Sequence, residues 1–156
     1  MFGAVVKVFP AIAVTNLSVR HAVALVPGIV DVVVIDEASQ CDIASALPML
    51  CRGKRAVIIG DEKQLTHVST ISKNDDQQIQ AKHNLSAASD QRFLYSAQSL
   101  FDLAKSTVGS SGYYISLKDH YRSRAEIIEF SNKVFYGSQL RVWTDYRRLK
   151  PIGNIE

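Results

Sequence analysis

The sequence contains little cysteine: Cys41 and Cys51 are its only two. A structural zinc site needs about four ligands, and there is no CxxC pair to supply two of them. His67 and His83 are far apart and lack the spacing of metal ligands, so we predict no metal cluster around them. The two cysteines are expected to be reduced thiols of a cytoplasmic protein.

Long apolar runs are also missing. The best candidate, residues 22–35, is interrupted by proline, glycine and aspartate. A membrane-spanning helix needs roughly 20 consecutive apolar residues, so none is predicted. Lys7 and Pro10 interrupt the apolar residues that follow Met1, so the pattern of a signal peptide is not met either. We therefore expect no membrane association and a cytoplasmic location.

The chain has no strong excess of one charge. Its 18 basic and 15 acidic residues give a net charge of +3, which by itself does not predict nucleic-acid binding. Basic residues gather near the end of the chain, at Arg141, Arg147, Arg148 and Lys150, where a solvated tail is the simpler explanation. A length of 156 residues suits one domain, or one domain and part of another.

Two short apolar runs organise the chain, at residues 32–35 and 56–59. The first is followed by Asp36 and Glu37, and the second by Gly60, Asp61 and Glu62. Such β-branched runs predict strands buried on both faces of a parallel sheet, here over 30–36 and 56–60. Because the carboxyl ends of parallel strands form the ligand-binding edge of such sheets, we expect these acids to face a common site.

The connection over residues 38–55 is long enough for the crossover helix that parallel strands require. We predict a helix over 42–50 that is capped by Asp42, with Ile43, Leu47 and Leu50 on its apolar face. Pro48 is expected to shorten or kink it. Before the first strand, periodicity and turn signals predict a helix over 2–9 stopped at Pro10, a strand over 11–14 and a short helix over 18–25. After the second strand they predict a solvated and partly helical insert over 73–91, an amphipathic helix from Phe93 to near Thr107 and a flexible joint over 109–112. The last predicted elements are a strand over 113–117 and a helix opened by a Ser123–Glu126 capping box and closed by Tyr136–Gly137.

The segment VVVIDEASQ resembles the Walker B box (motif II) of superfamily 1 helicases, in its DEAxQ form. IIGDEKQL resembles their motif III, and LKDHYRSRAEIIEFSNKVFY resembles their motif IV. The three segments follow the family's order, and the resemblance extends over roughly residues 9–136, nearest to the group typified by the nonsense-mediated-decay helicase. It implies part of an α/β, three-layer RecA-like P-loop NTPase fold, a parallel sheet flanked by helices. Residues 1–108 would be the C-terminal half of the first RecA-like domain, and residues 109–156 the beginning of the second.

The resemblance also implies roles for single residues. Asp36 would hold Mg²⁺ mostly through water, and Glu37, beside the metal, would take a proton from the water that attacks the γ-phosphate. Gln40 and Gln64 would orient that water or sense the phosphate. Gly60 would supply the turn beside the nucleotide, and Asp61 would link the nucleotide state to the bound strand. The alternative is that Asp36 and Glu37 are ordinary helix-capping acids.

Two further sites follow from the same resemblance. Arg122 would reach across the domain cleft to the γ-phosphate, with its neighbour Tyr121 on the nucleotide side; the alternatives are a surface ion pair for Arg122, with Asp119 or Glu126, and simple packing for Tyr121. Thr15 and Asn16 would contact the backbone of a single strand, because small polar groups bind phosphate oxygens without reading bases. Alternatively, they end a strand and cap the next helix.

The chain also departs from the family pattern. The phosphate-cradling loop GxxxxGK[ST] is missing: the only Gly-Lys pair, Gly53–Lys54, is followed by Arg55 and precedes a strand. Thr66–His67 stands where the family often has a proline pair, and motifs V and VI would lie beyond Glu156. We therefore predict that the chain by itself neither binds ATP tightly nor hydrolyses it.

The sequence thus predicts a fragment of an ATP- and Mg²⁺-dependent DNA or RNA helicase, with NTP hydrolysis coupled to single-strand translocation. Its partners would be single-stranded DNA or RNA and the remainder of the motor. One alternative is a non-catalytic module that binds nucleic acid or protein. Another is self-association, in which two chains cover a sheet edge left by missing strands. A third is an unrelated α/β enzyme that uses Asp36, Glu37 and Asp61 with another metal.

Overall fold

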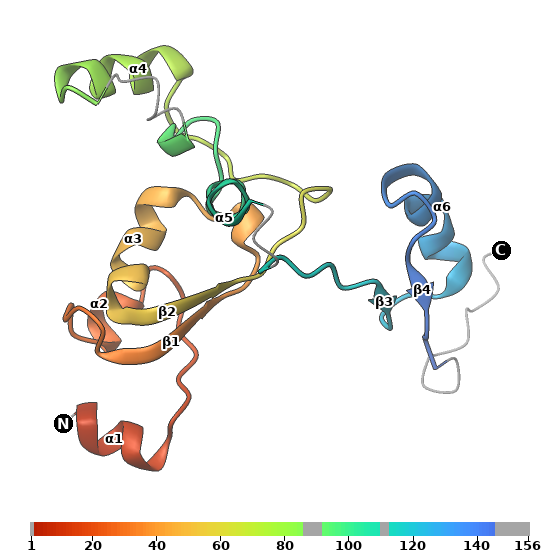
Figure 1. Ribbon diagram of the computed structural model, residues 1–156, viewed down its shortest axis with the longest axis horizontal. Helices are drawn as coiled ribbons and strands as arrows, with labels where there is room; N and C mark the ends of the chain where they lie inside the picture. Colours follow the sequence, from red (N-terminus) through yellow and green to blue (C-terminus); the bar gives the residue numbers. More distant parts are fainter. Residues whose placement is uncertain (1, 86–91, 110–112, 146–156) are drawn as a thin grey trace, which may run out of the picture. The chain divides into compact units, whose positions relative to one another are not determined.

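The computed structural model describes residues 2–85, 92–109 and 113–145. The chain divides into two compact units, Met1–Ser111 and Gly112–Glu156. The first unit contains α1 (Phe2–Val8), α2 (Val19–Ala22), β1 (Val30–Ile35), the 3₁₀ helix η1 (Ala38–Gln40), α3 (Ile43–Arg52), β2 (Gly53–Ile58), α4 (Lys73–Lys82) and α5 (Leu100–Val108) (Figure 1). The second unit contains β3 (Asp119–His120), α6 (Ala125–Phe135) and β4 (Arg141–Val142).

Strands β1 and β2 are parallel neighbours, as predicted, and α3 is the crossover between them. Their register pairs Val30 with Gly53 at one end and Ile35 with Ile58 at the other. β2 begins three residues earlier than expected, because Lys54 and Arg55 join the ladder rather than precede it. The Lys54 ammonium forms a 2.7 Å ion pair with Asp31 of β1, which holds the pKa of that carboxyl below its ordinary value.

Helix α3 begins as predicted at Asp42, whose Oδ1 accepts a 2.8 Å hydrogen bond from the Ser45 amide. The helix continues past Pro48 to Arg52. Its buried face is formed by Ile43, Ala46, Met49 and Arg52. The assignment of Leu47 to this face was wrong, since 56% of Leu47 is exposed.

The core of the first unit lies between β1 and helices α2, α3 and α5. Its buried residues are Val19, Val23, Ile35, Ala38, Cys41, Ala46, Met49, Leu100 and Phe101. Arg52 is buried against this core, and its guanidinium donates to the carbonyl oxygens of Val23 (2.8 and 3.1 Å) and Pro48 (2.6 Å). A buried charge is tolerated here because carbonyl oxygens accept hydrogen bonds from each of its three nitrogens.

The opposite face of the sheet is exposed, contrary to the prediction that both faces would be buried. Val32 is 45% exposed, Val34 60% and Val57 47%. Side chains alternate along a strand, so these valines point away from the helices that cover Ile35 and Ile58. An unbroken β-branched run indicates that both faces of the strand are apolar. It does not indicate whether these 156 residues also include the helices that would cover the second face.

Other elements of the first unit match the sequence only in part. α1 ends before Pro10 as predicted, whereas residues 11–14 form no strand. α2 is shorter than expected, and residues 61–72 form a loop, as the composition indicates. Within the predicted insert, α4 is helical and capped by a Ser72–Asp75 box, while residues 86–91 lie outside the described part of the chain.

α5 starts later than predicted. Phe93 and Leu94 lie outside it, because Ser99 and Asp102 form a capping box that fixes its first turn. The Ser99 hydroxyl accepts from the Asp102 amide at 3.1 Å, and the Asp102 carboxylate accepts from the Ser99 hydroxyl at 2.6 Å. The predicted joint at 109–112 lies mostly outside the described residues.

In the second unit, β3 and β4 are parallel and α6 connects them. The predicted strand over 113–117 is not formed, since no strand in the described residues pairs with it. The predicted capping box is also wrong: the residue before α6 is Arg124, and its side chain makes no capping hydrogen bond. Tyr136 and Gly137, with φ of +56° at the glycine, close α6 as expected.

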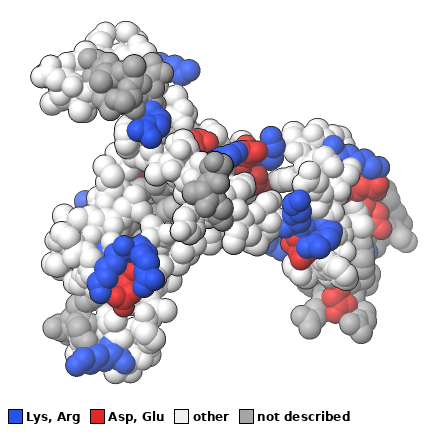
Figure 2. Space-filling model, in the orientation of Figure 1, with Lys and Arg blue, Asp and Glu red and all other residues white. Residues whose placement is uncertain are grey.

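The two signs of charge are intermixed. On the face shown in Figure 2, basic and acidic groups lie side by side rather than in large patches of one sign. Of the predicted basic cluster, only Arg141 is described; it forms a 2.6 Å ion pair with Asp119, and residues 147–150 lie outside the described part. Among the helices that the structure describes, each is too short or too polar to cross a bilayer.

Candidate functional site

The acidic residues that follow β1 and β2 leave the sheet at the same edge. Backbone pairing continues past the strand ends, where the Ile59 amide donates to the Ile35 carbonyl at 2.9 Å and the Ala38 amide donates to the Ile59 carbonyl at 2.8 Å. We call residues 36–40 the acidic turn and residues 60–64 the GDEKQ loop. These two bonds hold the acidic turn against the start of the GDEKQ loop, as the sequence predicted.

The acidic turn has an unusual backbone. Glu37 has φ of +53° and ψ of +38°, a left-handed conformation that costs a non-glycine residue roughly 1–2 kcal/mol. Asp36 supports it, because its Oδ1 accepts a 2.9 Å hydrogen bond from the Glu37 amide. The Gln40 side-chain amide donates to Glu37 Oε2 at 3.3 Å. All three side chains are exposed, so the turn presents two carboxylates and an amide to solvent.

The GDEKQ loop is organised by Asp61. Its Oδ1 accepts from the Lys63 amide at 2.9 Å, and its Oδ2 accepts from the Gln64 side-chain amide at 3.1 Å. Asp61 and Gln64, which were predicted separately, therefore form one hydrogen-bonded pair. The backbone amide of Asp61 also lies 3.5 Å from Ser39 Oγ, in the acidic turn.

Gly60 is needed for packing. A Cβ at this position would lie 2.6 Å from Phe101 Cδ2 and 3.1 Å from the Ser39 amide nitrogen. The GDEKQ loop therefore starts where the Phe101 ring of α5 and the acidic turn press against the same backbone. This is a structural reason for glycine, beside the expected role next to a nucleotide.

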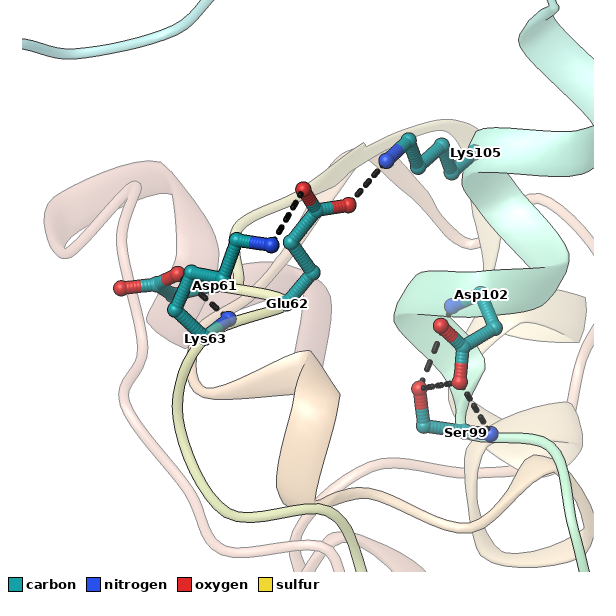
Figure 3. Close-up of polar contacts among 6 residues, drawn as sticks. All are labelled: Asp61, Glu62, Lys63, Ser99, Asp102 and Lys105. Atoms are coloured by element: carbon teal, nitrogen blue, oxygen red, sulfur yellow. Dashed lines mark hydrogen bonds and ion pairs between the residues drawn. The ribbon is translucent and has the colours of Figure 1, made fainter. Parts of the chain in front are cut away.

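An ion pair joins the GDEKQ loop to α5. The Lys105 ammonium contacts Glu62 Oε2, and Lys63 lies 3.7 Å from the other carboxylate oxygen (Figure 3). The hydrogen bond and the charge of Lys105 lower the pKa of Glu62 below its ordinary value. Figure 3 also shows the Ser99–Asp102 capping box one turn earlier in the same helix.

His67 forms a second link from this loop region. Its amide donates to the Ser39 carbonyl at 3.1 Å, and its Nε2 lies 2.7 Å from the Tyr95 carbonyl oxygen. The His67 and Tyr95 rings meet edge to face, with centroids 5.9 Å apart. In this chain, then, histidine performs a packing role where the family often has proline.

Thr15 and Asn16 are held in local contacts. The Thr15 hydroxyl lies 2.9 Å from Ser18 Oγ, and the Thr15 carbonyl accepts from the Val19 amide at the start of α2. The Asn16 amide donates to Cys41 Sγ at 3.0 Å. These contacts are those expected of a helix-starting turn, the alternative to a nucleic-acid contact.

Arg122 and Tyr121 lie in the second unit and are exposed. The surface ion pair between Arg122 and Asp119 is not formed, because Asp119 binds Arg141 and the Trp143 indole instead. Within the described residues, Arg122 has no hydrogen-bond or ion-pair partner. Its approach to the acidic turn stays a prediction.

The donor set of the acidic turn fits Mg²⁺ better than a metal held by protein alone. In the part of the chain that the structure describes, no group of three or more His, Cys, Asp or Glu residues is placed to hold a metal ion. Mg²⁺ is usually bound through one or two carboxylates together with waters and substrate phosphates. Asp36 and Glu37 can supply the carboxylates. A cradle for the phosphates is not among the sequence motifs, and weak binding of ATP by this chain stays a prediction.

Sequence reasoning missed several residues that build this site. Ser39 is 2% exposed and links the acidic turn to Asp61 and His67, yet a serine inside a motif carries no signal of burial. The Glu62–Lys105 pair spans 43 positions, too far for any helical spacing to indicate. Capping boxes are readable from sequence, and the Ser99–Asp102 pattern could have placed the start of α5.

Comparisons with known proteins support the resemblance to helicases. The AAA domain family matches residues 11–74. The uncharacterized ATP-dependent helicase MG140 of Mycoplasma genitalium is 33% identical over 141 residues, which is 86% of this chain and 12% of the relative. Its homolog in Mycoplasma pneumoniae is 32% identical over 143 residues, which is 89% of this chain and 12% of the relative. The chain thus spans about one eighth of the length of either relative.

Proposed function

This chain is a helicase-like segment with part of an α/β RecA-like P-loop NTPase fold, and we propose that it belongs to the motor of a superfamily 1, DEAxQ-type ATP-dependent helicase. In this proposal, residues 1–108 are the second half of the first motor domain, and residues 109–156 are the beginning of the second. The parent protein hydrolyses ATP and moves along single-stranded DNA or RNA. A cytoplasmic location is part of the proposal and is compatible with two unpaired thiols.

One observation carries the proposal: the parallel register of β1 and β2 brings Asp36 and Glu37 to the same edge as Asp61. Acidic residues at adjacent strand ends suit a nucleotide site, because ligands of open parallel sheets bind at that edge. Mg²⁺, when bound with a nucleotide, supplies positive charge to the phosphate oxygens. Asp36 would hold it mainly through water.

The other residues of the turn then have defined tasks. Glu37 accepts the proton of the attacking water, and its left-handed backbone turns the chain sharply just after β1. Gln40 holds that carboxylate by its 3.3 Å hydrogen bond. Because Asp61 and Gln64 are hydrogen-bonded, a shift of either residue on a change of nucleotide would displace the other and, with it, the GDEKQ loop. Arg122 comes from the second unit as the finger that stabilises charge on the γ-phosphate, a contribution of about 10³–10⁵ in rate in known cases.

Phosphate release from ATP tests this function. The isolated chain, with Mg²⁺ and single-stranded DNA or RNA, is expected to show no turnover. A longer polypeptide that carries this chain together with a GxxxxGK[ST] segment is expected to hydrolyse ATP, and Glu37→Gln should slow it by about 10²–10⁴-fold. The matched control is Asp31→Asn, an acid at the opposite end of β1, which should leave the rate unchanged. Equal rates for Glu37→Gln and the control would refute the assignment.

The exposed sheet face favours a second candidate function, a binding module whose apolar sheet face is the contact surface for another copy of the chain. Val32, Val34 and Val57 present an apolar surface that folded proteins rarely leave open. In the first proposal the remainder of the motor covers it; in the second, another copy of the chain does. Light scattering on the purified chain separates them, because a monomer at all concentrations contradicts self-association.

A further inference from the structure

The contact between Asn16 and Cys41 joins two segments that are far apart in the sequence. Asn16 lies in the turn before α2, and Cys41 directly follows the acidic turn. The Asn16 Nδ2 donates to Cys41 Sγ at 3.0 Å, across 25 positions of sequence. Asn16 is half-buried and Cys41 is 8% exposed, so this hydrogen bond is shielded from water.

Cys41 is fixed on every side. Its amide donates to the Ala38 carbonyl at 3.2 Å, which closes η1, and its carbonyl accepts from the Leu100 amide at 2.8 Å, at the start of α5. Its side chain completes the arrangement by accepting from Asn16. The residue that ends the acidic turn is therefore held by α5 on one side and by the turn before α2 on the other.

We propose that Asn16 is a positioning residue for the acidic turn rather than a ligand of nucleic acid. One of its two amide N–H donors is already committed to the Cys41 sulfur, and the side chain is half-buried rather than presented to solvent. Through Cys41 it fixes the end of the turn that carries Glu37 and Gln40. A nucleic-acid strand that binds at Thr15 would therefore change the position of the acidic turn through the Asn16 side chain. This inference rests on the proposed function only for the assumption that the acidic turn contacts a nucleotide.

The Cys41 thiol reports on this hydrogen bond. Burial raises the pKa of the thiol, the Asn16 hydrogen bond opposes that rise, and the charge of the neighbouring Asp42 adds to it. Loss of the bond in an intact fold would therefore raise the pKa further. Loosening of the whole region would instead expose the thiol and return its pKa toward the ordinary value. The two explanations shift the titration in opposite directions.

The experiment is the pH dependence of iodoacetamide alkylation at Cys41, in a Cys51→Ser background of the full chain. The midpoint is the readout because it reports the pKa of the thiol, whereas the plateau rate reports the access of iodoacetamide to the sulfur. We expect Asn16→Ala to move the midpoint to higher pH. Asn16→Asp, which removes the donor and adds a negative charge, should move it further. Leu17→Ala is the matched control, an exposed side chain in the same turn, and should leave the midpoint in place.

A second measurement covers the case of a destabilised variant. In ¹⁵N–¹H spectra, Asn16→Ala should shift the amides of Cys41 and Leu100 while the other signals stay dispersed. Equal midpoints for Asn16→Ala and Leu17→Ala, or a lower midpoint for Asn16→Ala, would overturn the proposal, and so would unmoved Cys41 and Leu100 amides. None of these measurements uses a nucleotide or a nucleic acid, so failure of the proposed function leaves their outcome unaffected.

Discussion

Replacement of Gly60 by alanine should destabilise the first unit through a steric clash at the point where the GDEKQ loop starts. The new Cβ would lie 2.6 Å from Cδ2 and 2.9 Å from Cγ of Phe101, and 3.1 Å from the backbone amide of Ser39. Phe101 is 7% exposed and belongs to the core, so its ring cannot swing into solvent. Overpacking of this kind typically costs about 1–3 kcal/mol.

Urea unfolding measures this cost. With a denaturant dependence of about 1–3 kcal/mol per molar, a loss of about 2 kcal/mol lowers the midpoint by roughly 1 M. Circular dichroism reports mainly the first unit, which holds most of the helical residues. Trp143, the single tryptophan, lies in the second unit, so its fluorescence transition should stay unchanged and serves as an internal control.

A double mutant tests the cause. Phe101→Ala removes the Cγ and Cδ2 atoms that the Cβ would meet, so Gly60→Ala should cost less in that background than in the wild type. Contacting residues usually show interaction free energies of about 0.5–3 kcal/mol in such cycles. An unchanged midpoint for Gly60→Ala, or the same cost with and without Phe101→Ala, would refute the packing argument.

Three further predictions concern stability. Arg52→Met keeps the volume but removes the guanidinium that donates to the Val23 and Pro48 carbonyls, which should cost about 1–3 kcal/mol in urea unfolding; a neutral result would contradict the bonding described. Asp42→Ala should cost about 1 kcal/mol by removing the α3 cap, and Asp42→Asn should recover most of it. The Glu62–Lys105 pair is exposed and contributes about 0–1 kcal/mol. Since folding lowers the pKa of Glu62, that contribution is present above the ordinary glutamate value and is lost as pH falls through the lowered pKa. The stability gap between wild type and Glu62→Gln should therefore close in acid, and a gap independent of pH would contradict the pairing.

Local patterns predicted the centre of the fold well. The parallel strands, the Asp42 cap and the two acidic strand ends follow from β-branched runs, turn residues and the length of the crossover. Each depends on neighbours within a few positions. The acids of the site could be found this way because they directly follow the strands that position them.

Features that depend on distant partners were not predictable. Residues 113–117 have the composition of a strand, but a strand exists only where another pairs with it, and the described residues offer none. Leu47 has helical spacing, yet Ala46 and Met49 face the core, because tertiary packing chooses the buried face. Ser39, His67 and Lys105 gain their roles from contacts across 22 to 43 positions, which periodicity does not carry.

The central claim is that the ends of β1 and β2 form one metal- and phosphate-facing edge. Mn²⁺, a paramagnetic substitute for Mg²⁺, tests it directly by broadening nearby amide signals in ¹⁵N–¹H spectra. We predict that Mn²⁺ broadens the amides of residues 36–40 and 60–64 together, and that an Asp36→Asn/Glu37→Gln double variant abolishes this effect at both segments. Broadening centred elsewhere, or unchanged in the double variant, would contradict the account.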